Sequence, residues 1–116
     1  MGLGNWLARK GNVGGTARAV AKGWKFFKLQ NPEMSDKELA EAYVYFRYGN
    51  TGEMELAVRA LSLLEKFEPT PLNLAWALLL NENPQESDYI AEKKYDEWRQ
   101  IMREEIDKME LPHRIY

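Results

Sequence analysis

The hydrophobic pattern of this chain centres on Glu53–Asn81, which reads as two apolar helical segments joined by a proline corner. The second segment, Leu72–Leu80, is apolar at every position except Asn73. A helix that is apolar nearly all round must be covered on nearly all sides. The first segment, Glu53–Phe67, has only a narrow polar stripe, formed by Glu55, Arg59, Ser62 and Lys66. We therefore predict that Glu53–Asn81 forms a buried central hairpin.

Local signals mark where the helices start. Thr70 precedes Pro71, so it can cap the apolar helix while the proline occupies the first helical position, where its missing N–H costs nothing. Ser35 and Glu38 have the spacing of a capping box, in which each side chain bonds to the backbone N–H of the other residue. These signals predict helices over Asp36–Tyr48 and from Pro71 to about Glu82.

Two flanking segments have an apolar stripe on one face, as helices that cover a core do. The first is Thr16–Gln30, whose stripe continues back to Val13 and includes Trp24. The second is Asp88–Glu110, with apolar residues at helical spacing. Its stripe consists of Ala91, Tyr95, Trp98, Met102, Ile106 and Met109.

No stretch alternates between apolar and polar residues as a strand would. We predict an all-α single domain over residues 1–116, with about five helices arranged as a helical bundle or as stacked αα-hairpins. Residues 1–15 are glycine-rich and are expected to be flexible, with a short first helix ending at Gly11. Residues 111–116 are expected to be a frayed tail.

Composition narrows the class of protein. The chain has 116 residues, of which 45% are hydrophobic and 29% charged, as expected for one soluble globular domain. It has no cysteine, which excludes disulfides, thiolate metal sites and a cysteine nucleophile, and which fits a cytoplasmic protein. Its longest apolar run is far shorter than the roughly 18–20 residues that cross a bilayer.

Charge is segregated along the chain. Residues 1–32 contain six basic side chains and no acidic one, whereas residues 33–116 contain ten basic and eighteen acidic side chains. The basic segment is therefore expected to meet something anionic: the rest of this chain, or an external nucleic acid, membrane surface or acidic protein. The candidate anion- or partner-binding residues are Arg9, Lys10, Arg18, Lys22 and Lys25.

The sequence shows no group of residues that is typical of a catalytic site. The single histidine, His113, lies in the tail, and the carboxylates belong to charged helix faces that read as solvated surface. The nucleophile-elbow, zinc-protease and phosphate-loop motifs are absent. We therefore predict no catalytic residue, no cofactor and no metal site, and hence a protein that is not an enzyme.

One stretch resembles a tetratricopeptide repeat, because an aromatic residue, a glycine, an alanine and a proline occur at that family's spacing. These residues are Tyr48, Gly52, Ala57 and Pro69. The resemblance implies two antiparallel helices, but the chain departs from the pattern at Glu41, Tyr45 and Arg103. An ordinary αα-hairpin explains the same residues.

A second stretch, Gly11–Gly14, resembles the Gly-x-x-Gly backbone clamp of KH domains, which hold nucleic-acid phosphates. A KH domain also needs a β-sheet, for which the chain has no pattern. The favoured interpretation is a plain connection between two helices, in which Gly14–Thr16 starts the second helix. The alternative is that the backbone N–H groups at this helix start bind an anion.

Taken together, the sequence favours a small non-enzymatic protein-interaction module that binds an unknown protein or a second copy of itself. The expected interaction surface comprises Tyr45, Tyr48 and Trp98. The alternative is binding of nucleic acid or another polyanion through the basic N-terminal segment.

Overall fold

The computed structural model describes residues 3–49 and 52–109, with side chains from residue 12 onward. Within these residues the chain forms six α-helices and no strand, which confirms the all-α prediction. The helices are α1 (Leu3–Gln30), α2 (Asp36–Gly49), α3 (Met54–Leu64), α4 (Pro71–Glu82), α5 (Ser87–Lys93) and α6 (Tyr95–Asp107).

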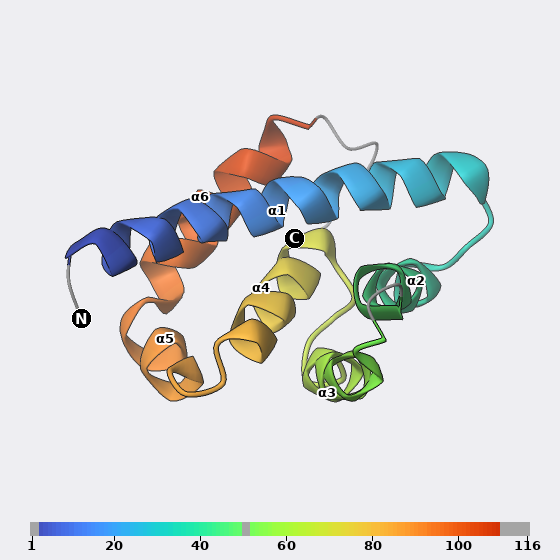
Figure 1. Cartoon of the computed structure of the whole chain (residues 1–116). Coiled ribbons are helices and arrows are strands. Elements are labelled where there is room, and N and C mark those ends of the chain that lie inside the picture. The colour runs from blue at the N-terminus through green and yellow to red at the C-terminus, as the bar shows by residue number, and fades with distance from the viewer. Residues whose placement is uncertain (1–2, 50–51, 110–116) are drawn as a thin grey trace.

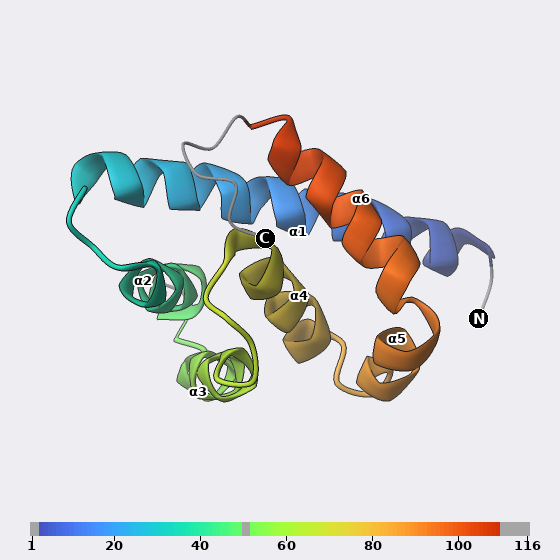
Figure 2. The ribbon, with the colours of Figure 1, turned by 180° about the vertical axis from the view of Figure 1, so that it is seen from behind.

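Helix α1 lies along the longest dimension of the molecule, and the other helices gather beneath and behind it (Figure 1). At 1.5 Å per residue its 28 residues are about 42 Å long, close to the 45 Å long axis of the molecule. It packs against α6, α4 and α2. Helix α4 sits at the centre, between α3 on one side and α5 and α6 on the other (Figure 2).

The prediction of a buried hairpin is confirmed for α4 and wrong for α3. Ten of the twelve residues in α4 are buried. The Thr70 hydroxyl accepts a hydrogen bond from Asn73 N at 3.1 Å, as the capping signal predicts. In α3, by contrast, Met54 is 49% and Val58 63% exposed. Helix α3 lies at the edge of the molecule and packs mainly on α2 and α4, so much of its outer side is left uncovered.

The predicted break near Gly11–Gly15 is also wrong, because α1 is continuous from Leu3 to Gln30. Glycine costs a helix interior about 1 kcal/mol relative to alanine, which is why the sequence suggested an interruption. Packing of the neighbouring helices against α1 offsets the cost of its glycines. Gly14 is buried, and a Cβ there would lie 3.6 Å from Glu105 Cγ, an ordinary van der Waals distance, so α6 packs against α1 at this position.

The last predicted helix, Asp88–Glu110, is instead two helices that meet at Lys94. The break changes which side chains face inward: Ile90 is buried, while Ala91 and Tyr95 of the predicted stripe are exposed. The predicted tail, residues 111–116, lies outside the described residues.

Candidate functional site

The outer side of α1 carries two large apolar side chains among lysines. Lys22, Phe26 and Leu29 are separated by four and three residues, and Lys25 lies three after Lys22 and four before Leu29, so the four share one face of the helix. Phe26 is 58% and Leu29 71% exposed, and both lysines are exposed. Neither lysine forms an ion pair with any residue that the structure describes. We call these four residues the basic-apolar face.

The opposite side of α1 is buried, which explains why this face is left to solvent. Its inward residues include Val13, Ala17, Val20 and Trp24. Position 26 is therefore turned outward, although the Phe26 ring touches the partly buried Phe27 at a centroid distance of 5.8 Å.

The aromatic surface continues from α1 onto α2. The rings of Phe27 and Phe46 are 5.8 Å apart and nearly perpendicular, a favourable edge-to-face arrangement. The Phe46 ring is more than half exposed, although large aromatic side chains usually lie in the core. Helix α2 is turned so that Ala40 and Val44 enter the core instead.

The structure divides the five predicted cationic residues into three groups. Lys22 and Lys25 face solvent. Arg18 forms an ion pair with Glu105 of α6 at 3.2 Å and keeps the pKa of that carboxyl below its usual value. The side chains of Arg9 and Lys10 lie outside the described part of the chain. Arg18 of the basic segment therefore meets the acidic remainder of the chain, whereas Lys22 and Lys25 form no ion pair with a residue that the structure describes.

The three predicted interaction-surface residues separate as well. Tyr45 is exposed, as predicted. Tyr48 and Trp98 are buried, so neither side chain lies on the surface. Trp98 is one of the buried residues of α6, which packs against α1 and α4.

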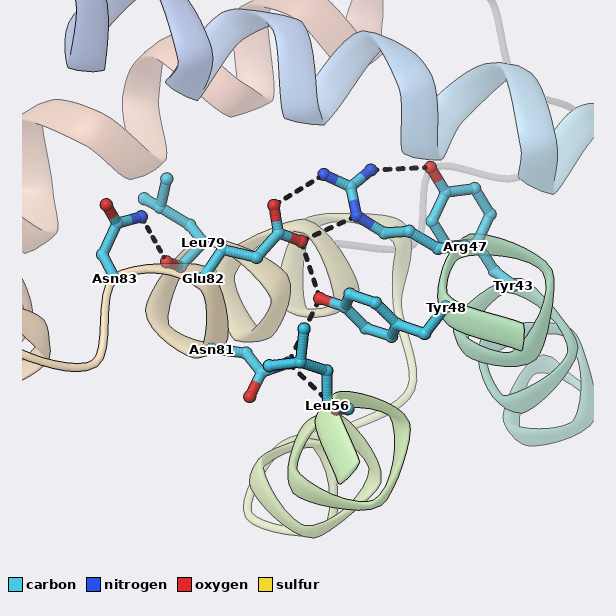
Figure 3. Close-up of polar contacts among 8 residues, drawn as sticks. All are labelled: Tyr43, Arg47, Tyr48, Leu56, Leu79, Asn81, Glu82 and Asn83. Atoms are coloured by element: carbon cyan, nitrogen blue, oxygen red, sulfur yellow. Dashed lines mark hydrogen bonds and ion pairs between the residues drawn. The ribbon is translucent and has the colours of Figure 1, made fainter. Parts of the chain in front are cut away.

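Tyr48 belongs instead to a polar network that joins α2, α3 and α4 (Figure 3). The Arg47 guanidinium donates two hydrogen bonds to the Glu82 carboxylate, at 2.7 and 2.9 Å. The Tyr48 hydroxyl donates to the same carboxylate at 2.6 Å and accepts from Asn81 Nδ2 at 3.1 Å. Asn81 Nδ2 also donates to the Leu56 carbonyl at 3.0 Å, which fixes the orientation of the amide.

A polar hollow of about 390 Å³ opens beside this network, between α1 and the end of α4. Its charged lining groups are Arg47 and Glu82, which neutralise each other. Its other lining residues are Asn12, Gly15, Thr16, Ala19 and Asn83. The network therefore links the three helices structurally. The charged groups that line the hollow cancel, so they offer a charged ligand no net attraction.

A second set of side-chain contacts, made by Arg99, joins α4 to α6. Arg99 lies over the Tyr95 ring, 4.9 Å from its centroid, and donates to Asn73 Oδ1 at 2.9 Å. Burial lowers the pKa of Arg99, because a charged guanidinium is less favourable away from water. This contact holds the start of α4 against α6 through a cation–π interaction and one hydrogen bond.

Because of the Tyr48 hydroxyl, the stability of the fold is expected to change with pH in the alkaline range. Burial and, next, the hydrogen bond to Glu82 raise the pKa of Tyr48 above its ordinary value of about 10. In the unfolded chain this proton is lost near pH 10, whereas the folded chain holds it to higher pH. The stabilisation is therefore complete below about pH 10 and falls as the pH rises above it.

We accordingly expect that the unfolding free energy declines between about pH 10 and 11.5, and that Tyr48→Phe makes this decline shallower. Urea titrations at several pH values measure both curves. Tyr89→Phe, which changes an exposed tyrosine, serves as the control and should leave the slope unaltered. Equal slopes for wild type and Tyr48→Phe would show that Tyr48 is not the responsible group.

Two searches of the described residues were negative. No three metal-ligating side chains lie close enough together to hold an ion. No helix among them combines the length and apolarity needed to cross a membrane.

Comparison with known proteins found no matching family model, no matching curated protein and no matching solved structure. The likenesses to tetratricopeptide repeats and KH domains gain no support from it. The α2–α3 hairpin does place Gly52 in the left-handed conformation, with φ of 73°, which suits a tight turn between antiparallel helices in any αα-hairpin.

Proposed function

We propose that this chain is a non-enzymatic protein-interaction module whose working surface is the basic-apolar face of α1. The observation that supports the proposal best is the high exposure of Phe26 and Leu29 directly beside two exposed lysines that form no ion pair with a described residue. Such a surface suits a protein segment that offers apolar side chains at its centre and carboxylates at its rim. A cytoplasmic location remains a prediction.

The energetics favour a partner that covers the apolar groups. Burying a Phe or Leu side chain contributes roughly 1.5–3 kcal/mol, whereas an exposed ion pair contributes about 1 kcal/mol or less. Phe26 and Leu29 would therefore supply most of the affinity. Lys22 and Lys25 would mainly select and steer an acidic partner.

The alternative is polyanion binding through the same lysines, with Arg9 and Lys10 contributing. The exposure of Lys22 and Lys25 is compatible with it. Two observations count against it: Arg18 is already engaged by Glu105, and Leu29, the most exposed apolar residue of the face, offers a phosphate backbone nothing. Polyanion affinity would fall steeply with salt, with a slope that reports the number of phosphates contacted.

Site-specific photo-crosslinking tests the proposal. A benzoylphenylalanine at position 26 should give discrete protein adducts in a cell extract, whereas the same group at position 89 should not. Tyr89 is a matched control, because it is also aromatic and also 58% exposed, but it lies on α5.

Identical adducts from both positions, or none from position 26, would refute the proposed surface. Adducts that disappear after nuclease treatment would favour the polyanion alternative instead.

A further inference from the structure

A hollow of about 510 Å³ lies between α3, the end of α4 and α5. Helices α3 and α5 both pack on α4 but make no substantial contact with each other. They lie on either side of α4, and α1 crosses α4 on its other side (Figures 1 and 2). We call this space the α3–α5 hollow. Its lining includes no described residue of α1, so it is separate from the basic-apolar face.

Apolar side chains from all three helices line the α3–α5 hollow. Leu80 of α4 is buried, and Ala91 of α5 is exposed. Leu63 of α3 and Phe67, just after α3, are half-buried. An apolar side chain placed in the hollow would remove the remaining surface of Leu63 and Phe67 from water, which is favourable in proportion to the area buried.

The α3 edge of the hollow is basic. Arg59 and Lys66 both line it, and both are exposed. Neither forms an ion pair with any residue that the structure describes, and Arg59 only donates to the Asn81 carbonyl at a long 3.5 Å. Two acidic residues of this region, Glu55 and Glu65, are not among the residues that line the hollow. Two positive charges therefore border the hollow on its α3 side.

The α5 edge has the opposite charge, because the exposed Asp88 lines it. A phosphate chain laid in the hollow would meet this carboxylate and the apolar lining, neither of which attracts a phosphate. A protein segment fits better, provided that its carboxylates lie along α3 and that polar or basic side chains lie along α5. The charges of the two edges would then fix the orientation in which such a segment binds.

The spacing of the two cations specifies the segment further. Arg59 and Lys66 are seven residues apart, which is about 10 Å along α3 at 1.5 Å per residue. A partner helix running alongside α3 would match this spacing with two carboxylates that are also seven residues apart. Its apolar side chains at helical spacing would then face the apolar lining, as in other complexes in which an amphipathic helix occupies a groove.

We propose that the α3–α5 hollow is a second docking site, which binds an amphipathic helix of a protein partner. The helix has one apolar side and two carboxylates seven residues apart along the edge next to α3. This docking site and the proposed α1 surface are separate, and neither depends on the other. With both surfaces, one copy of the chain would hold two partner segments at the same time.

Selection from a display library of random peptides tests the chemistry of the partner. Peptides of about 16 residues are long enough for about four helical turns. Panning on the full chain should enrich peptides that combine apolar residues at helical spacing with two acidic residues seven apart. Fluorescence anisotropy of the enriched peptides then measures their affinity for wild type and variants.

Arg59→Glu with Lys66→Glu should weaken binding of these peptides by about tenfold or more, because two ion pairs become two like-charge pairs. Ser62→Glu, at an exposed position that also lines the hollow, should weaken it as well while keeping both cations. Circular dichroism melting checks that these exposed substitutions leave the fold intact. Lys22→Glu with Lys25→Glu is the matched control, since it makes the same charge change on α1 and should leave the affinity unaltered.

The inference is overturned if no peptide is enriched, or if the enriched peptides lack the acidic pair. It is also overturned if wild type and the Arg59 and Lys66 variant bind the peptides equally. Peptides that lose affinity only with the Lys22 and Lys25 variant would place binding on α1. In that case the α3–α5 hollow is not the docking site, whereas the proposed function stands.

Discussion

Replacing Asn81 with alanine is expected to lower the free energy of unfolding by about 1–3 kcal/mol, the cost of leaving a buried polar group without its partner. Asn81 is fully buried, and its Nδ2 supplies the donor to both the Leu56 carbonyl and the Tyr48 hydroxyl. Removing Asn81 Oδ1, which has no hydrogen-bond partner among the described residues, offsets a small part of this cost. The loss should loosen α3, because the hydrogen bond to the Leu56 carbonyl is one of its polar links to α4.

Urea unfolding at neutral pH measures this effect as a lower midpoint with an unchanged slope. Asn12→Ala is the matched control, since Asn12 is exposed on α1 and alanine favours a helix more than asparagine does. The control should be neutral or slightly stabilising. A midpoint for Asn81→Ala that equals that of the control would mean that water can replace the amide at this site.

Gly23→Ala is expected to destabilise the protein by about 1–3 kcal/mol, the usual cost of overpacking a core. A Cβ at position 23 would lie 2.5 Å from Tyr43 Cε2 and 2.6 Å from Tyr43 Cδ2. The Tyr43 ring is buried, and its hydroxyl accepts from Arg47 Nη1 at 3.4 Å, so the ring cannot simply turn away. This collision outweighs the roughly 1 kcal/mol that alanine normally contributes to a helix relative to glycine.

Gly15→Ala on the same helix should have the opposite sign. A Cβ there would meet only the end of the flexible Arg18 side chain, at 3.8 Å, so the helix-propensity gain should appear as a stabilisation of about 0.5–1 kcal/mol. Thermal and urea unfolding of the two variants, measured side by side, compare these effects. Stabilisation by both substitutions would show that α1 and α2 are not held together at Gly23.

Local chemistry accounts for the parts of the fold that the sequence predicted well. The capping box forms as predicted, with Ser35 N donating to Glu38 Oε1 and Glu38 N donating to Ser35 Oγ. The burial of α4 follows from its apolar composition alone. Such signals depend on neighbouring residues, so they can be read without knowing what packs against the helix.

The errors arise where packing between distant segments overrides local preference. The glycines of α1 predict a break, yet contact with α6 keeps the helix continuous. The stripe after Asp88 predicts one helix, yet the bend at Lys94 places both Ile90 and Trp98 in the core. In each case the deciding partner is far away in the sequence.

The candidate site was predictable in part. The exposure of Lys22 and Lys25 follows from their position opposite the apolar stripe of α1, and the same helical spacing places Phe26 and Leu29 beside them. That signal was present in the sequence but was hidden by the usual assignment of large apolar residues to the core. The Tyr48–Glu82 contact joins residues 34 positions apart and has no local signal.

The central claim is that apolar and basic side chains of the α1 face act together in binding a protein. Crosslinking from position 26 in a chain that carries Leu29→Ser tests it most directly. Losing a buried leucine costs roughly 1.5–3 kcal/mol, so the adduct yield should fall about tenfold or more at limiting concentration, and Lys22→Glu should lower it less, because an exposed ion pair contributes about 1 kcal/mol or less. An unchanged yield with Leu29→Ser, together with a lost yield with Lys22→Glu, would contradict the claim and indicate a purely electrostatic polyanion site.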